Sequence, residues 1–267
     1  MDRNPAVAGQ FYPASSSLLK KELKALMVTE GEKEDAIGVV SPHAGYEYSG
    51  IVAGSVLSSI VQKGIYVLLG PDHTGMGKPF SIMARGVWKM PMGDVEIDSE
   101  LANEILKSTD YVEEDDSAHS YEHSIEVEIP FLQYLKKNFK IVPIIISRST
   151  LGVYRAIGRA IGKAVERVGK GAVIIASTDL THYESQESAV HKDKKAIEAI
   201  LELDEEALVH RVEEMNISMC GVAPTAVMLT SAKYLGATSA KMVKYQTSGD
   251  TSGDYTSVVG YAGILIL

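Results

Sequence analysis

Apolar residues along the chain recur with two periodicities, which predict a regular succession of helices and strands. Apolar positions three to four residues apart indicate helices, and short runs rich in Val and Ile indicate buried strands. The predicted helices are Ser16–Leu26, Ser49–Ile60, Asp98–Leu106, Val153–Val168, Ser188–Leu201, Glu205–Met215 and Pro224–Tyr234. The predicted strands begin at Ile37, Tyr66 and Val173 or span Pro79–Val87, Ile141–Ile146, Met242–Tyr245 and Ser257–Leu267. Ser124–Phe139 is mixed, because Pro130 weakens a helical interpretation.

This alternation is typical of an α/β fold with a mixed, mainly parallel sheet flanked by helices. A chain of 267 residues with 45% hydrophobic content can bury the core of one large domain or of two smaller ones. No linker, internal repeat or low-complexity tract interrupts the pattern. We therefore expect a single domain over residues 1–267.

Charge and cysteine content narrow the possible partners and compartment. The net charge is −9 and no Lys/Arg-rich run occurs, which argues against nucleic acid or an anionic membrane as the main partner. The chain shows no signal segment and no stretch of about 20 apolar residues that would span a bilayer. One cysteine excludes an internal disulfide. We expect a cytoplasmic protein, and nothing in the sequence indicates its oligomeric state.

Histidines follow three of the predicted strands, which points to a shared site. His43, His73 and His182 each come a few residues after an apolar run. The carboxyl ends of parallel strands in α/β proteins meet in one crevice, where ligands bind. Clustered imidazoles there indicate a metal ion or acid–base chemistry. For His43 and His73 the alternative is a loop histidine bonded to backbone, although the repeated turn around Pro42 and Pro71 makes coincidence less credible.

The segment around His182 carries a second chemical signal. Asp179 lies three residues before His182, so its carboxylate could orient the imidazole and raise its basicity. The alternative is a helix N-cap, since Ser177, Thr178 and Asp179 are all favourable caps.

The remaining histidines give weaker signals. His119 and His123 are four residues apart and would chelate on a helix, but their surroundings look like a loop that enters a helix near Ser124. His191 and His210 lie in charged helical segments and are expected to face solvent.

Cys220 is the only thiol and precedes a predicted helix. A helix N-terminus lowers the pKa of a thiol and favours the thiolate that binds metals, whereas the alternative is a small buried apolar residue. The nucleophile elbow of α/β-hydrolases, the P-loop and the His-Glu-x-x-His zinc motif are all absent.

Several motifs together resemble those of the Memo family. In chain order they are Pro5–Pro13, Ser41–Tyr46, Gly70–His73, Glu122–Val127, Ser177–His182, Met219–Gly221, Thr247–Asp250 and Val258–Gly263. They span nearly the whole chain. Microbial members resemble protein B of the AmmeMemoRadiSam set, which implies AMMECR-type or radical-SAM proteins as partners. The family is similar to the class III extradiol dioxygenases, non-haem iron enzymes that open catechol rings, and this resemblance implies their fold.

The resemblance also implies roles for individual residues. His43 and His73 fall on the two histidine ligands of Fe(II), and Cys220 takes the place of the carboxylate ligand. His182 falls on the acid–base position beside Asp179, and His123 lines the same pocket. A thiolate is softer than a carboxylate, so copper or zinc becomes possible beside iron.

These implications leave two main functions open. The first is a metal-dependent oxidoreductase acting on a phenolic or other chelating small molecule, with His182 moving the proton. The second is a protein whose vestigial site binds a peptide or protein partner through rim residues such as Tyr46 and Trp88. A zinc hydrolase is a third, weaker hypothesis.

Overall fold

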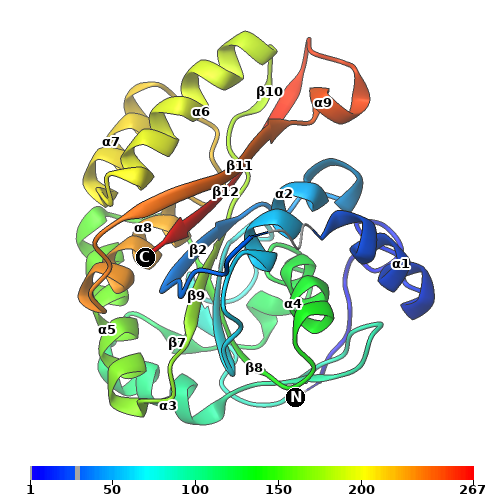
Figure 1. Cartoon of the computed structure of the whole chain (residues 1–267). Helices are drawn as coiled ribbons and strands as arrows, with labels where there is room; N and C mark the ends of the chain where they lie inside the picture. Colours follow the sequence, from blue (N-terminus) through cyan, green and yellow to red (C-terminus); the bar gives the residue numbers. More distant parts are fainter. Residues whose placement is uncertain (1, 28–30) are drawn as a thin grey trace.

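Four parallel strands form the centre of the molecule and end at the same edge. The computed structural model describes residues 2–27 and 31–267, so Met1 and residues 28–30 of the predicted domain lie outside it. The central strands, in spatial order, are β2 (Gly38–Ser41), β9 (Val173–Ser177), β3 (Ile65–Pro71) and β8 (Lys140–Ile146). The sequences of these strands are almost continuously apolar, because helices cover both faces of the sheet (Figure 1).

Antiparallel strands extend the sheet on both sides of this parallel centre. β12 (Val258–Ile266) pairs with β2 and carries β10 (His182–Glu184) and β11 (Ala240–Thr247). At the opposite edge β4 (Phe80–Ile82) pairs antiparallel with β8 and carries β7 (Glu113–Glu114). A small separate sheet joins β1 (Asp2–Arg3), β5 (Val87–Trp88) and β6 (Val95–Glu96).

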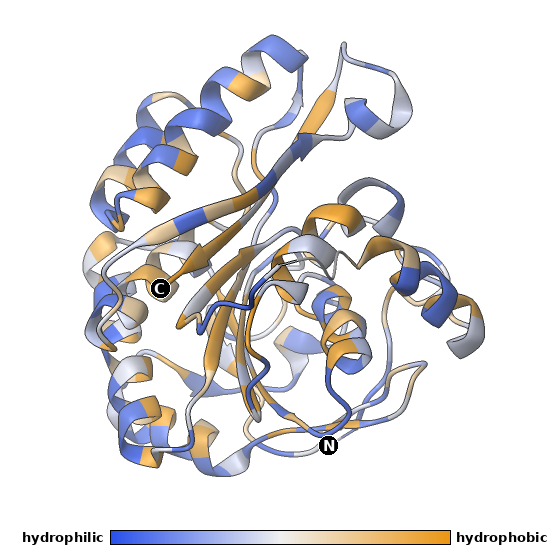
Figure 2. Ribbon diagram, viewed as in Figure 1, coloured by the Kyte–Doolittle hydropathy of each residue, from blue (hydrophilic) through white to orange (hydrophobic). Residues whose placement is uncertain are grey.

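Two hydrophobic cores lie on opposite faces of the sheet. One lies under α3 (Ser99–Ser108), α5 (Leu151–Val168), α6 (Gln186–Leu201), α7 (Glu205–Glu214) and α8 (Val222–Tyr234). The other lies under α1 (Ser16–Leu26), α2 (Tyr46–Ser58) and α4 (Ile129–Leu135). Neighbouring residues of β2 show the alternation, since Val40 belongs to the first core and Val39 to the second. Apolar colour accordingly concentrates in the strands, and polar colour on the outer helix faces (Figure 2).

The predicted fold class, α/β with a mixed and mainly parallel sheet between helices, is confirmed. The Asp98 cap is also confirmed, because its carboxylate accepts the Leu101 N–H at 3.0 Å. The predicted strand Pro79–Val87 is wrong, since it divides into β4 and β5 in two different sheets. Within the described residues, no helix has the length and apolarity needed to cross a bilayer.

Strand register explains why distant histidines converge. Ser41 at the end of β2 lies opposite Ser177 at the end of β9, and Leu69 near the end of β3 lies opposite Ala176. The loops that follow these strands therefore leave the sheet side by side. They carry His43, His73 and Asp179, and His182 follows at the start of β10.

Gly260 of β12 holds the loop after β9 against the sheet. Its carbonyl accepts the Leu180 N–H at 2.8 Å, and its N–H donates to the Thr181 carbonyl at 2.9 Å. A Cβ at this position would lie 1.8 Å from Oδ2 of the buried Asp193. Asp193 in turn accepts the Thr181 N–H at 2.9 Å through Oδ1.

Gly260→Ala is expected to lower the free energy of unfolding by about 1–3 kcal/mol, because the methyl group displaces a buried carboxylate. Urea unfolding measures this change. The matched control is Gly64→Ala, since a Cβ there has nothing within 4 Å. Equal stability of the two variants would show that the Asp193 contact is not tight.

Candidate metal centre

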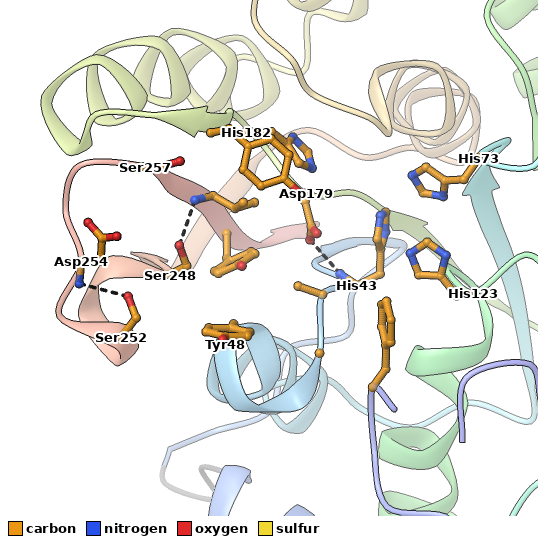
Figure 3. A pocket seen from close by; sticks show the side chains of 16 residues that line it. His43, Tyr48, His73, His123, Asp179, His182, Ser248, Ser252, Asp254 and Ser257 are labelled. Carbon is orange, nitrogen blue, oxygen red and sulfur yellow. Dashed lines mark hydrogen bonds between the residues drawn. The ribbon is translucent and has the colours of Figure 1, made fainter. Parts of the chain in front are cut away.

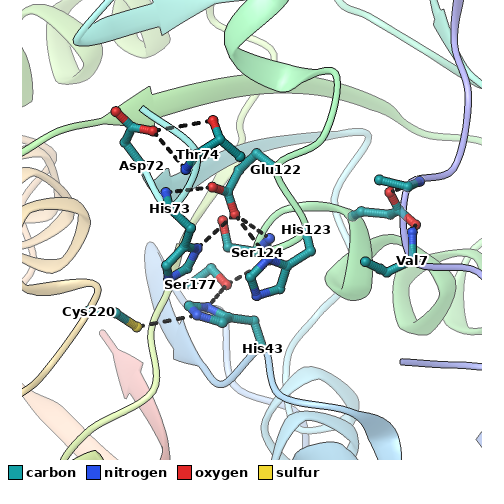
Figure 4. Close-up of polar contacts among 12 residues, drawn as sticks. Val7, His43, Asp72, His73, Thr74, Glu122, His123, Ser124, Ser177 and Cys220 are labelled. Carbon is teal, nitrogen blue, oxygen red and sulfur yellow. Dashed lines mark hydrogen bonds and ion pairs between the residues drawn. The ribbon is translucent and has the colours of Figure 1, made fainter. Parts of the chain in front are cut away.

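Three imidazoles from separate loops lie together at the carboxyl edge of the sheet. One ring nitrogen from each of His43, His73 and His123 lies within 4.8 Å of the other two (Figure 4). The ring centroids of His73 and His123 are 4.7 Å apart and nearly stacked. Each imidazole offers a nitrogen ligand suited to zinc, copper or iron, so the described residues contain a possible three-histidine metal site.

A buried carboxylate orients His73. Glu122 Oε1 lies 2.9 Å from Nδ1 of His73, and Oε2 accepts the backbone N–H of the same residue at 2.7 Å. With its Nδ1 proton donated to Glu122, His73 presents the Nε2 lone pair to the cluster. Metal-binding histidines commonly have such a carboxylate partner. Burial would lower the pKa of His73, but the hydrogen bond and charge of Glu122 outweigh it and raise that pKa.

Glu122 remains ionised although it is buried. Burial alone would raise its pKa, but hydrogen bonds from His73 and from the Ser124 N–H lower it to about 2. Its Oε1 also lies 3.5 Å from Nδ1 of His123. One carboxylate therefore serves two of the three imidazoles. Glu122 was not among the residues expected at the site, although its place directly before His123 in the Glu122–Val127 motif was the available signal.

The Ser177 hydroxyl orients His43, so that its Nδ1, like that of His73, points to a hydrogen-bond acceptor. Nδ1 of His43 lies 2.8 Å from Ser177 Oγ, whose own proton is donated to the Ser124 carbonyl at 2.8 Å. Ser177 therefore accepts from Nδ1, which leaves the Nε2 lone pair of His43 facing Cys220 Sγ at 3.3 Å. Burial, together with the neighbouring imidazoles, lowers the pKa of His43 well below its ordinary value. His43 is consequently neutral, the form that binds metals.

Cys220 lies beside His43 and outside the group of three imidazoles. Its Sγ is 3.3 Å from His43 Nε2 and accepts the Asp179 N–H at 3.3 Å. The expected low thiol pKa is wrong for the metal-free protein, because burial, with the charge of Asp179, raises the pKa of Cys220 to about 12. Desolvation outweighs the helix N-terminus here.

Asp179 supports His43 and makes no hydrogen bond to the His182 ring. Its Oδ1 accepts the His43 backbone N–H at 2.9 Å, and burial raises its pKa to about 6. Nδ1 of His182 is buried and has no hydrogen-bond partner among the described residues. The expected Asp179–His182 pairing is therefore wrong for this structure. Both side chains nevertheless line the same pocket as the histidine cluster (Figure 3).

That pocket has a volume of about 640 Å³ and opens past Tyr48 and Tyr183. Tyr46 and Trp88, expected at its rim, are 2% and 0% exposed and belong to the core. His119 lies outside the cluster. Its ring is buried, and the ring centroids of His119 and Trp88 are 6.0 Å apart. His123 is therefore the pocket histidine of that segment. His191 and His210 are exposed, as predicted.

A second carboxyl group lies beneath His43. Glu128 Oε2 accepts the Ser41 hydroxyl at 2.8 Å, and Oε1 lies 3.3 Å from Ser177 Oγ. Burial raises the pKa of Glu128 to about 8 against these hydrogen bonds. A neutral carboxyl group thus supports the hydroxyl that orients His43.

Glu128→Gln should change how stability depends on pH. The folded pKa of Glu128 lies above its ordinary value of 4.5, so its contribution is complete below pH 4.5 and is lost as pH rises through about 8. The glutamine variant cannot ionise and should gain stability relative to wild type, by on the order of a few kcal/mol, between pH 5 and 9. Urea unfolding of metal-free protein measures this. The exposed Glu187→Gln is the control, and a difference independent of pH would contradict the prediction.

Comparison with known proteins agrees with the resemblance in the sequence. The family model described as Memo-like protein matches residues 3–265. A MEMO1 family protein of Methanopyrus kandleri is 44% identical, with 99% of each chain covered. One from Methanococcoides burtonii is 46% identical, again with 99% of each chain covered.

A solved structure supports the fold at much lower sequence identity. The crystal structure of an uncharacterized protein from Escherichia coli K12 matches with a TM-score of 0.55 and 11% identity, covering 85% of this chain and 98% of that one. This likeness concerns the fold alone. The family match over residues 3–265 and the relatives at 44% and 46% identity show that the chain belongs to the Memo family.

Proposed function

We propose that this protein is a metal-dependent oxidoreductase that acts on a phenolic or other chelating small molecule. The observation that carries the proposal is the convergence of three imidazoles, two of them oriented by hydrogen bonds at Nδ1, at a pocket. His43 and His73 both direct Nδ1 toward a hydrogen-bond acceptor, and Nε2 of His43 faces the thiol of Cys220. Such an arrangement suits a transition metal better than a structural role.

His43 and His73 would supply two ligands, and Cys220 the third. The 3.3 Å between Cys220 Sγ and His43 Nε2 is a separation that two ligands of one ion can adopt. His123 is the competing donor, since its ring nitrogen lies in the same group as those of His43 and His73. Fe(II) follows from the resemblance to the dioxygenases, and the thiol makes copper or zinc the alternatives.

A bound ion would supply a coordination site for the chelating oxygens of a substrate. The residues of this chain provide the proton chemistry. His182 has an unpartnered buried Nδ1 and lines the pocket, so its imidazole is available to accept or donate a proton. Asp179 accepts the backbone N–H of His43, and its negative charge interacts with His182 and His73.

Removal of ligands should identify the metal site. His43→Ala, His73→Ala and Cys220→Ser should each lose most bound metal, measured by mass spectrometry on anaerobically prepared protein, and His123→Ala should retain it. The exposed His210→Ala serves as the control. Retention in Cys220→Ser with loss in His123→Ala would move the third ligand to His123. A wild type that cannot be loaded with Fe(II), Cu(I) or Zn(II) would refute the metal site.

His182→Ala should separate chemistry from metal binding. We expect oxygen uptake with catechols to fall by about 10²- to 10⁴-fold, the usual contribution of a general acid–base, while metal content stays near that of wild type. His191→Ala is the exposed control. Loss of the metal from His182→Ala would contradict the role assigned to this residue.

A binding function without catalysis is the second proposal, and the width of the pocket and its exposed tyrosines favour it. Tyr48 is 38% and Tyr183 79% exposed at the pocket. Partner binding of this kind would survive removal of His43 and His73 but fail after Tyr48→Ala or Tyr183→Ala. The opposite pattern would favour the oxidoreductase.

A further inference from the structure

The pocket in front of the histidines has an uneven distribution of charge. Two carboxylates line it, Asp179 near the histidine cluster and Asp254 on the outer segment before β12 (Figure 3). None of the described residues that line it is Lys or Arg. The walls therefore offer an anionic group on a ligand no Lys or Arg side chain with which to pair.

Aromatic rings form much of the wall between these carboxylates. Phe11 packs against His123 with ring centroids 4.9 Å apart, and Tyr48, Tyr183 and Tyr261 also line the pocket. Ring faces attract cations, most strongly where water is partly excluded.

Tyr183 is held in a backbone conformation that tyrosine rarely adopts. Its φ is 58°, and it lies where the register between β10 and β12 shifts. Backbone strain of this kind persists mainly at functional sites. The strain keeps this exposed ring at the pocket beside His182, whose ring centroid is 5.9 Å away.

Asp254 places a fixed negative charge at the outer end. Its Oδ1 accepts the Thr256 N–H at 2.9 Å and the Thr256 hydroxyl at 2.6 Å. These hydrogen bonds lower the pKa of Asp254, so it is ionised at neutral pH. Its own N–H donates to Ser252 Oγ at 3.1 Å. Oδ2 has no partner among the described residues and is free for a ligand.

We propose that the pocket selects a chelating aromatic ligand that carries an ammonium group at the end remote from the histidines. The aromatic ring lies between the rings of the pocket wall, and the ammonium group meets Asp254 and the faces of Tyr48 and Tyr183. A carboxylate or phosphate at that end would lose water without gaining a cationic partner and would be repelled by Asp254. Only the chelating end of the ligand depends on the proposed metal site, and the preference for an ammonium group does not.

Matched probes that differ in terminal charge test this selectivity. Zinc-loaded protein is titrated by calorimetry with dopamine, 4-ethylcatechol and 3-(3,4-dihydroxyphenyl)propionate, and zinc content is measured in the same samples. We expect dopamine to bind at least about tenfold more tightly than the propionate, with 4-ethylcatechol between them. Asp254→Asn should reduce that ratio, whereas Asp110→Asn, an exposed carboxylate outside the pocket, should leave it unchanged.

A second pair of probes separates this proposal from the metal site. Tyramine and 3-(4-hydroxyphenyl)propionate lack the catechol and are compared on metal-free protein by ligand-observed NMR. Preference for tyramine that weakens in Asp254→Asn would support the charge selectivity even if zinc fails to load, an outcome that overturns the proposed function alone. Equal binding in either series would overturn the inference. Tighter binding of the propionates would also overturn it and would favour an anionic ligand such as an acidic peptide.

Discussion

The candidate site depends on the parallel pairing of β2, β9 and β3. Because β2 and β9 pair with Ser41 opposite Ser177, and β3 runs alongside with Leu69 opposite Ala176, their carboxyl ends lie at one edge. A slip of a single residue would turn inward-facing side chains to the opposite face of the sheet. The two hydrophobic cores prevent that slip, since each strand supplies alternate residues to each core. Packing remote from the pocket thus sets the positions of the histidines.

Sequence reasoning predicted the parts of the site that follow from strand ends. His43 and His73 were expected to meet because each follows an apolar run, and in the structure they do. The periodicity could not show that Glu122 folds back to accept two hydrogen bonds from His73, because that contact depends on the path of a loop. The expectation that Trp88 lies at the pocket rim was also wrong, because an aromatic residue near polar motifs can equally belong to a buried core.

The errors about Cys220 and Asp179 share one physical cause. The expected low thiol pKa and the expected Asp179–His182 pair were both inferred from local sequence. In the folded chain, burial decides the pKa of the thiol, and the backbone of a distant loop takes the carboxylate. Burial and long-range hydrogen bonds also leave Glu122 ionised and Glu128 neutral, although the two residues are only six positions apart. Local motifs predict which groups are present more reliably than their protonation.

The high pKa of Cys220 bears on how the thiol survives in the presence of oxidants. Peroxide and alkylating reagents attack the thiolate, and desolvation, which raises the pKa of the Cys220 thiol to about 12, keeps it protonated at neutral pH. As the third metal ligand proposed above, Cys220 would therefore be kept in an unreactive form until a cation binds. Deprotonation would accompany arrival of a cation, so that the most oxidisable atom of the site becomes reactive only when it is engaged in coordination.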